Sequence, residues 1–292
     1  MTRTSLLRLP AVLFIAAVVS AIGARAQNFE RASTGLTDTL QNAIDLLPEG
    51  VNNVRLGLGP VMGTDYEGSD HYKVDPVPVV SLRYRNLIEV DNNEVKLIAL
   101  NRLVSANTSM GGSTSLRAGP LISINFGRGE GDNHDLRGMG NVGTSLELGA
   151  FVSYYFSHNK SRVRLRARQD VVGGHSGATV TADFIQSFIR TDNFVLGGSV
   201  SSTWVSGPYM RSYFGVSPTQ AAASGYPVFN PGAGFKDVAF GLNGNYTIAP
   251  QWSLVAAVDY KRLIGSAANS PVVRLVGSPN QMSFSTFIVY SF

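Results

Sequence analysis

The strongest indication of fold class in this sequence is QMSFSTFIVYSF, Gln281–Phe292. Every second residue is large and apolar or aromatic, with the exception of Thr286, whereas the residues between them are smaller and mostly polar. Successive side chains of a β-strand point to opposite faces, so this pattern predicts a strand with one apolar and one wetter face. Because Phe292 is the last residue, the strand is expected to run to the end of the chain.

A terminal apolar strand suits a membrane barrel better than a soluble sheet. In a soluble sheet it would be an aggregation-prone edge, whereas in a closed barrel it pairs with the first strand and leaves no edge. Its apolar positions also resemble the terminal signal that outer-membrane barrels present to their assembly machinery; these are Phe284, Ile288, Tyr290 and Phe292. The last strand of an ordinary soluble sheet stays open as an alternative, because short alternating segments are weak signals.

Residues 1–26 are predicted to be a secretory signal peptide. Arg3 and Arg8 precede an apolar run over residues 11–22, and Ala24-Arg25-Ala26 fits a cleavage site after Ala26. The run is shorter than the roughly 20 residues that a spanning helix needs, and a retained anchor is the alternative. The formal net charge of +4 includes three arginines and no acids from this segment, which leaves +1. Charge therefore gives no reason to expect nucleic acid as a partner.

The composition suits one large β-rich domain. The chain has 292 residues, of which 31 are glycine and only 15% are charged. The mean hydropathy is close to zero, as expected when lipid-facing residues alternate with lumen-facing ones. The absence of cysteine excludes disulfide bonds, thiol catalysis and cysteine-based metal sites.

The spacing of apolar residues predicts one helix followed by twelve strands. The helix is expected within Phe29 to Gly50, in an N-terminal periplasmic segment over residues 27–52, because Leu36 and Leu40 begin an apolar stripe at helical spacing. The barrel is expected over residues 53–292. Its strands are predicted, in chain order, at 53–62, 75–85, 86–91, 94–103, 113–126, 142–156, 161–171, 178–190, 193–206, 235–249, 251–263 and 281–292.

The connections between these strands alternate in length. Most links after odd-numbered strands are long, such as GTDYEGSDHYKV, GRGEGDNHDLRGMG and the stretch from Gly207 to Gly234, whereas Thr191-Asp192 and Ala249-Pro250 are tight turns. Long outer loops that alternate with short periplasmic turns are typical of an outer-membrane barrel. The predicted fold class is therefore an all-β, transmembrane, antiparallel barrel of about 12 strands, in a range of roughly 10–12.

Charged residues fall on one face of the predicted strands. An arginine at the lipid midplane would cost about 2–4 kcal/mol, so the four arginines that alternate along strand 161–171 are expected to face the lumen. The inward-facing charges are Arg162, Arg164, Arg166 and Arg168, together with Arg55, Arg83, Arg117, Glu147, Asp183, Asp237, Asp259 and Lys261. Two interpretations stay open: a charge lattice that packs a narrow lumen, and a pore lining that favours anions.

The sequence offers little support for an enzyme. The four histidines, His71, His134, His158 and His175, form no spaced pair on one strand, so no metal site, cofactor site or catalytic residue is predicted. Acidic outer-loop residues could bind calcium alongside lipopolysaccharide or simply be solvated; they are Asp65, Glu67, Asp70, Glu130, Asp132 and Asp135. Outer-loop aromatics could pack into a cap or contact a partner; they are Tyr66, Tyr209, Tyr213, Phe214 and Tyr226.

Several stretches, taken in order, resemble the MipA/OmpV family of outer-membrane proteins. They are LGLGP with the acidic loop DYEGSD and the strand PVPVVSLRYRN (Leu56 to Asn86), GHSG (Gly174 to Gly177), the loop from Tyr209 to Phe235, and YKRLIGSAANSPVV (Tyr260 to Val273). The resemblance runs from Val54 to Phe292 and does not extend to the segment from Phe29 to Gly50.

The resemblance implies a non-enzymatic outer-membrane barrel in the envelope of a Gram-negative bacterium. Its implied role is a scaffold that links a lytic murein transglycosylase to a bifunctional penicillin-binding murein synthase in peptidoglycan remodelling. The scaffold contacts would come from the periplasmic turns and from Phe29 to Gly50. Outer-membrane lipid, lipopolysaccharide and the barrel assembly machinery are the other expected partners. A small-solute channel that favours anions and a surface-exposed adhesin or antigen stay open as alternatives.

Overall fold

The computed structural model describes residues 52–105, 114–156 and 160–292. The predicted signal peptide, the predicted helix in residues 29–50 and His158 lie outside the described residues. None of the helices within the described part of the chain is long and apolar enough to cross a lipid bilayer.

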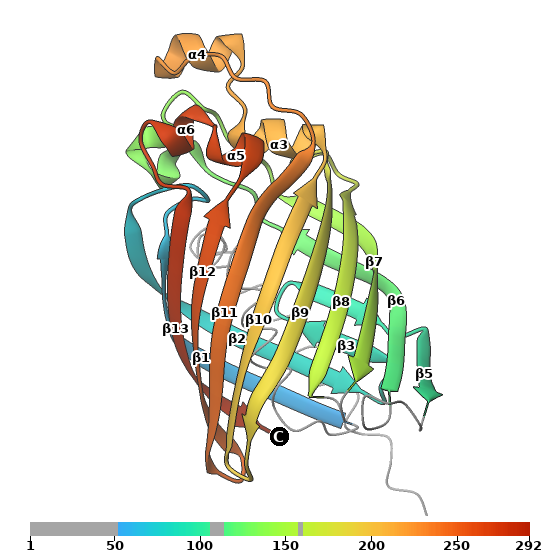
Figure 1. Cartoon of the computed structure of the whole chain (residues 1–292). Coiled ribbons are helices and arrows are strands. Elements are labelled where there is room, and N and C mark those ends of the chain that lie inside the picture. Colours follow the sequence, from blue (N-terminus) through green and yellow to red (C-terminus); the bar gives the residue numbers. More distant parts are fainter. Residues whose placement is uncertain (1–51, 106–113, 157–159) are drawn as a thin grey trace, which may run out of the picture.

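Long antiparallel strands make up most of the described chain (Figure 1). Apolar and polar residues alternate along these sequences. Because successive side chains of a strand point to opposite faces, each strand gains one apolar and one polar face. The strands are β1 (Asn52–Thr64), β2 (Tyr72–Tyr84), β3 (Ile88–Asp91), β4 (Glu94–Leu97), β5 (Leu100–Ser105), β6 (Thr114–Asn125), β7 (Ser145–Phe156), β8 (Ser161–Asp170), β9 (Ala178–Arg190), β10 (Phe194–Val205), β11 (Gly234–Ala249), β12 (Trp252–Leu263) and β13 (Asn280–Ser291).

The sheet closes on itself. Neighbouring strands pair in chain order, β1 pairs with β13, and β4 pairs with β6 to complete the ring. The register at the β1–β13 junction sets Arg55 opposite Ser291 and Leu58 opposite Ile288. This closure confirms the predicted antiparallel barrel and gives the terminal strand a partner on each side.

One predicted strand is split in two. Residues 94–103 were expected as a single strand, but β4 and β5 are separate pieces that both pair with β6 and occupy one place in a twelve-stranded wall. The break lies beside Gly119, where an added Cβ would come within 1.8 Å of the Leu97 carbonyl oxygen. Ile98 N–H donates to the Leu87 carbonyl at 2.7 Å, and Ala99 N–H donates to the Ala118 carbonyl at 3.0 Å. The wall is therefore continuous across the break.

Short helices close one end of the barrel, opposite the end where the chain terminates (Figure 1). The prediction that only residues 29–50 would form a helix is wrong, because the outer loops contain several helices of their own. Prolines at the first helical turn start three of them, and their shortness hides any helical period in the sequence. They are α3 (Gly207–Phe214), α4 (Pro218–Ser224), α5 (Gly265–Ala268), α6 (Pro271–Arg274) and the 3₁₀ turns η1 (Glu130–Asp132) and η2 (His134–Leu136).

These loops pack into an apolar cluster that we call the outer cap. Its members come from four outer loops and from the ends of β10 and β12, and all are buried: Tyr66, Leu136, Met139, Val142, Val205, Tyr209, Met210, Tyr213, Phe214, Val216, Leu263, Ala267, Val272 and Val273. Polar groups in it are satisfied locally, because Tyr66 donates its hydroxyl hydrogen to the Val272 carbonyl at 3.0 Å and Ser270 donates to the Phe214 carbonyl at 2.7 Å. The outer-loop aromatics thus form a cap, which was one of the two expectations for them.

Candidate functional site: the charged interior of the barrel

The arginines of β8 lie on the inner face of the wall. Along this strand Arg162, Arg164 and Arg166 are buried and Arg168 is half-buried, whereas Val163, Leu165 and Ala167 are exposed on the outer face. Arg164 is 2% and Arg166 is 1% exposed. Both contact one carboxylate of the neighbouring strand β9, since Arg164 Nε lies 3.1 Å and Arg166 Nη2 lies 3.2 Å from Asp183 Oδ2. The register explains the contact, because Arg164 and Asp183 are directly opposite each other.

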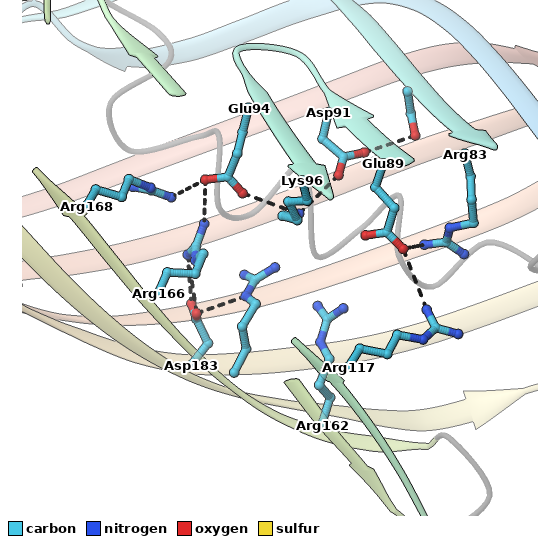
Figure 2. Close-up of polar contacts among 12 residues, drawn as sticks. Arg83, Glu89, Asp91, Glu94, Lys96, Arg117, Arg162, Arg166, Arg168 and Asp183 are labelled. Atoms are coloured by element: carbon cyan, nitrogen blue, oxygen red, sulfur yellow. Dashed lines mark hydrogen bonds and ion pairs between the residues drawn. The ribbon is translucent and has the colours of Figure 1, made fainter. Parts of the chain in front are cut away.

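The β3–β4 hairpin supplies carboxylates to the same interior (Figure 2). Glu94 lies between two arginines of β8: its Oε2 is 2.6 Å from Arg168 Nη2 and 3.9 Å from Arg166 Nη1. Lys96 joins it from the same strand, with Nζ 3.3 Å from Glu94 Oε1 and 3.2 Å from Asp91 Oδ2. The hairpin therefore connects to β8 across the barrel interior.

A second group of contacts continues the network. Glu89 Oε1 lies 3.1 Å from Arg83 Nη2 and 3.6 Å from Arg117 Nη1, so β2, β3 and β6 are linked by one carboxylate. The guanidinium groups of Arg117 and Arg162 lie over the ring of Tyr155, at 4.9 and 5.6 Å from its centroid. We call the whole set the charged layer: Arg83, Glu89, Asp91, Glu94, Lys96, Arg117, Arg162, Arg164, Arg166, Arg168 and Asp183.

The sequence prediction missed four members of this layer. Glu89, Asp91, Glu94 and Lys96 are buried, although they lie on the two shortest paired strands. The signal was present, because both pairs of charges are spaced by two residues and so share one face of a strand. The two strands of the hairpin were predicted, at 86–91 and 94–103, but their charges were not assigned to the lumen, because strands of four residues carry little periodicity of their own.

A second charged cluster lies beneath the outer cap. Lys236 Nζ is 2.5 Å from Glu67 Oε1 and 2.7 Å from Asp237 Oδ2, and Lys261 Nζ is 3.2 Å from Glu67 Oε1. Burial alone would raise the pKa of the Glu67 carboxyl, but the ammonium groups of Lys236 and Lys261 outweigh it and hold that pKa at about 2. Asp259 is also buried on the inner face of β12. Glu67 therefore anchors the first outer loop as a carboxylate.

The acidic side chains of the outer loops make contacts within the protein. Glu67 is occupied by two lysines, and Asp132 accepts a hydrogen bond from Gly129 N–H at 2.7 Å as a 3₁₀-turn cap. Asp65 instead accepts from Asn133 Nδ2 at 2.9 Å, which ties the first outer loop to the third. In the described parts of the chain no three or more acidic or histidine side chains are grouped to hold a metal ion. Asp65 thus connects two loops, Glu67 holds its loop to β11 and β12, and Asp132 caps a turn within its own loop.

His175 and Glu147 form a buried pair at the outer end of β7. His175 Nε2 lies 2.9 Å from Glu147 Oε1, and His175 Nδ1 accepts a hydrogen bond from Gly177 N–H at 3.0 Å. Its ring packs against Tyr209 of α3, with centroids 4.9 Å apart. The stretch GHSG is thus a tight turn under the cap, and a Cβ on Gly177 would come within 2.5 Å of the Tyr209 backbone nitrogen.

Comparison with solved structures finds barrels of similar length at low sequence identity. The NanC porin is 14% identical, with coverage of 82% of this chain and 98% of that one and a TM-score of 0.41. The translocator domain of the autotransporter NalP from Neisseria meningitidis is 10% identical, with coverage of 90% and 99% and a TM-score of 0.40. OmpT of Vibrio cholerae is 6% identical, with coverage of 85% and 100% and a TM-score of 0.35. The search of curated proteins found no match.

Comparison with protein families gives the identification. The family model described as MltA-interacting protein MipA matches residues 56–292, which begin within β1 and include every later strand. The match also contains the charged layer and the outer cap. This chain therefore belongs to the MipA family and is a β-barrel of the Gram-negative outer membrane.

Proposed function

We propose that this protein is a non-enzymatic, non-conducting scaffold of the outer membrane that binds a lytic murein transglycosylase from the periplasmic side. The observation that carries the proposal is that side chains fill the barrel at two levels. The charged layer is buried at mid-barrel, and the outer cap is buried at the outer mouth. A barrel that is filled in this way supports binding at its rim rather than passage through its centre.

The chemistry of the interior supports a structural role for it. Each carboxylate of the charged layer contacts at least one cation, and buried charges that are paired and hydrogen-bonded fix one arrangement of the strands. His175 is held between Glu147 and the Gly177 backbone N–H, so its two ring nitrogens are used in holding the GHSG turn. These side chains are committed to the fold, which supports a non-enzymatic function.

The periplasmic rim supplies a surface for a partner. Arg85 in the β2–β3 turn, Lys160 before β8 and Arg190 at the end of β9 are all exposed at the end of the barrel opposite the cap. Three cations on one rim favour a partner with an acidic surface, because complementary charge steers association. The family description names MltA as the interacting protein, and its family role as a lytic transglycosylase places that partner on the periplasmic side.

The test is a binding measurement with matched charge reversals. The purified full chain in detergent is immobilised, and a lytic transglycosylase of the MltA type is passed over it at two salt concentrations. We expect Arg85→Glu, Lys160→Glu and Arg190→Glu together to weaken binding at least tenfold. The control reverses three exposed arginines on the outer side, Arg137, Arg211 and Arg274, and should leave binding unchanged. Equal binding by both triple variants, or no binding by the parent chain, would overturn the scaffold.

An anion channel is the second candidate, and one observation favours it. Cations outnumber carboxylates in the charged layer, as in a pore lining that selects anions. Planar-bilayer recording separates the two functions. The scaffold predicts no stable conductance steps, whereas anion-selective steps that disappear in an Arg164→Gln, Arg166→Gln variant would establish the channel and replace the non-conducting barrel.

A further inference from the structure

Among the described strands, one edge of β2 has a partner over only a short part of its length. β2 pairs with β1 from Tyr72 to Tyr84, but on its other side β3 pairs only with Ser81–Tyr84. The β3–β4 turn closes this contact, because Asn92 N–H donates to the Val80 carbonyl at 2.8 Å and Val80 N–H donates to Asn92 Oδ1 at 2.9 Å. Beyond Val80, none of the strands that the structure describes pairs with this side of β2. We call residues 74–78 on this side the β2 edge.

The β2 edge is almost entirely an acceptor surface. Val80 directs both its N–H and its carbonyl toward the hairpin, and backbone groups alternate in direction along a strand. Val74, Pro76 and Pro78 therefore point the same way. Proline has no N–H, so three carbonyls and one N–H remain on the edge. No hydrogen bond among the described residues uses these carbonyls. In hydrocarbon, an unsatisfied backbone group is costly, so a ligand that can donate to them is favoured.

The prolines also exclude one class of ligand. A strand from a second copy or from another protein would need alternating donors and acceptors on the edge, and proline at two successive positions removes the donors. The side chains on the outer face are apolar: Val74 is 61% exposed, and Leu58, which lies opposite Pro78 on β1, is exposed as well. The edge thus combines an apolar face with hydrogen-bond acceptors.

The position of the β2 edge along the barrel determines which leaflet of the membrane it faces. Tyr72, at the start of β2, adjoins the first outer loop, because Asp65 N–H donates to the His71 carbonyl at 3.1 Å. The β2 edge lies directly after it, on the side of the barrel that carries the cap. It therefore faces the outer leaflet, where acyl chains that carry amide N–H and hydroxyl groups belong to lipopolysaccharide. Phospholipid acyl esters have no such donors.

We propose that the β2 edge binds an amide-linked, hydroxylated acyl chain of an outer-leaflet lipid. The donors of the chain meet the carbonyls of Pro76 and Pro78, and its methylene groups lie against Val74. This site is independent of the periplasmic rim, so the failure of one proposal leaves the other unaffected. It also gives a physical reason for the prolines of the stretch PVPVVS, which would otherwise weaken a barrel wall.

Photocrosslinking tests the site in the full chain. Since the chain has no cysteine, a single Val74→Cys carries a benzophenone label, and the protein is reconstituted in phospholipid vesicles with or without lipopolysaccharide. The control label is at Leu242→Cys, which is 48% exposed on β11 between two fully paired neighbours. We expect at least fivefold more lipopolysaccharide adduct at position 74. Equal adducts at the two positions, adducts with phospholipid alone, or adducts with a second copy would each overturn the proposal.

A proline variant tests the donor argument. Pro76→Ala with Pro78→Ala restores two N–H groups at the edge, and we expect the lipopolysaccharide retained through purification, measured by mass spectrometry, to fall several-fold. Pro120→Ala, on β6, is the matched wall-proline control and should retain the parental amount. Heat-modifiable gel mobility checks that each variant is folded. If the folded double variant retains as much lipopolysaccharide as the control, the absence of N–H groups at Pro76 and Pro78 has no part in lipid binding, and the proposal fails.

Discussion

The charged layer and the outer cap both exclude water, but opposite kinds of side chain do so. In the charged layer, Asp183 contacts two arginines within 3.2 Å, and each side chain depends on the charge of its neighbours. In the outer cap, residues such as Met210 and Phe214 are fully buried among other apolar side chains. Removal of one partner of a buried ion pair leaves the other charge uncompensated, so the stabilisation is lost at once. The stability of apolar packing falls gradually with the volume that is removed. The barrel wall should therefore respond to mutation cooperatively and the cap locally.

The largest effect is expected from Asp183→Ala. The change removes the carboxylate that Arg164 and Arg166 share in a buried site, and breaking a buried ion pair costs about 3–5 kcal/mol. Urea unfolding in detergent micelles measures the loss as a lower midpoint. Asp192→Ala, in an exposed periplasmic turn, is the control and should change the free energy of unfolding by no more than about 0.5 kcal/mol. Similar midpoints for both variants would show that the charged layer does not hold the wall.

A somewhat smaller and more local effect is expected from Met210→Ala in the outer cap. Truncation of a buried methionine costs about 2–5 kcal/mol, and here it should loosen the loops while the strands stay paired. Limited proteolysis then cuts the outer loops faster, with an unchanged far-ultraviolet circular dichroism spectrum. Val228→Ala, which is exposed in the same loop, is the matched control. If the barrel unfolds together with the cap, the two regions are one cooperative unit.

A pH effect is expected in the first outer loop, which Glu67 holds to the barrel. The lysines hold the pKa of Glu67 at about 2 in the folded chain, below its usual value of 4.5. Its stabilising contribution is therefore complete above pH 4.5 and is lost as the pH falls toward 2. Hydrogen exchange of the first outer loop should rise across this window. In Glu67→Gln, the exchange should be fast already at neutral pH and change little on acidification; a parallel rise in parent and variant would exclude Glu67 as the cause.

The smallest effect on stability is expected from Phe292→Ala. This side chain is exposed and contacts only the ring of Tyr290 among the described aromatics, with centroids 4.8 Å apart, so the loss should stay within about 1 kcal/mol. We propose that it acts in assembly with Phe284, Ile288 and Tyr290, so the amount of folded protein in outer membranes should fall severalfold. Phe188→Ala, another exposed aromatic on β9, is the control. Equal amounts of both variants in the membrane would show that Phe292 has no special part in assembly.

The barrel wall could be predicted because the same alternation of apolar and polar residues is repeated in strand after strand. Each long strand alternates by itself, and the four arginines of β8 fix which face is inside. Strands such as β9 and β12 were therefore placed within a residue or two of their observed bounds. The β4–β5 break was not predictable, because it depends on contact with Gly119, a residue of another strand.

The interior contacts and the cap were only partly predictable for the same reason. Alternation shows that Arg166 faces inward, and its partner Asp183 comes from the adjacent strand β9, but Glu94 of β4 reaches it only across the barrel interior. Cap helices of four to eight residues are stabilised by tertiary packing, so they carry little local signal. Glu67 contacts Lys236 only because the first outer loop reaches the outer end of β11, far away in the sequence.

The pairing of β1 with β13 has a consequence for how the barrel forms. The junction joins the two ends of the barrel sequence, because Leu58 of β1 lies opposite Ile288 of β13. No stable wall can exist until both ends are present, and contacts so distant in sequence form slowly. We therefore expect the strands to stay open to wrong pairings until the last strand meets the first, so a slow final closure is a consequence of the topology.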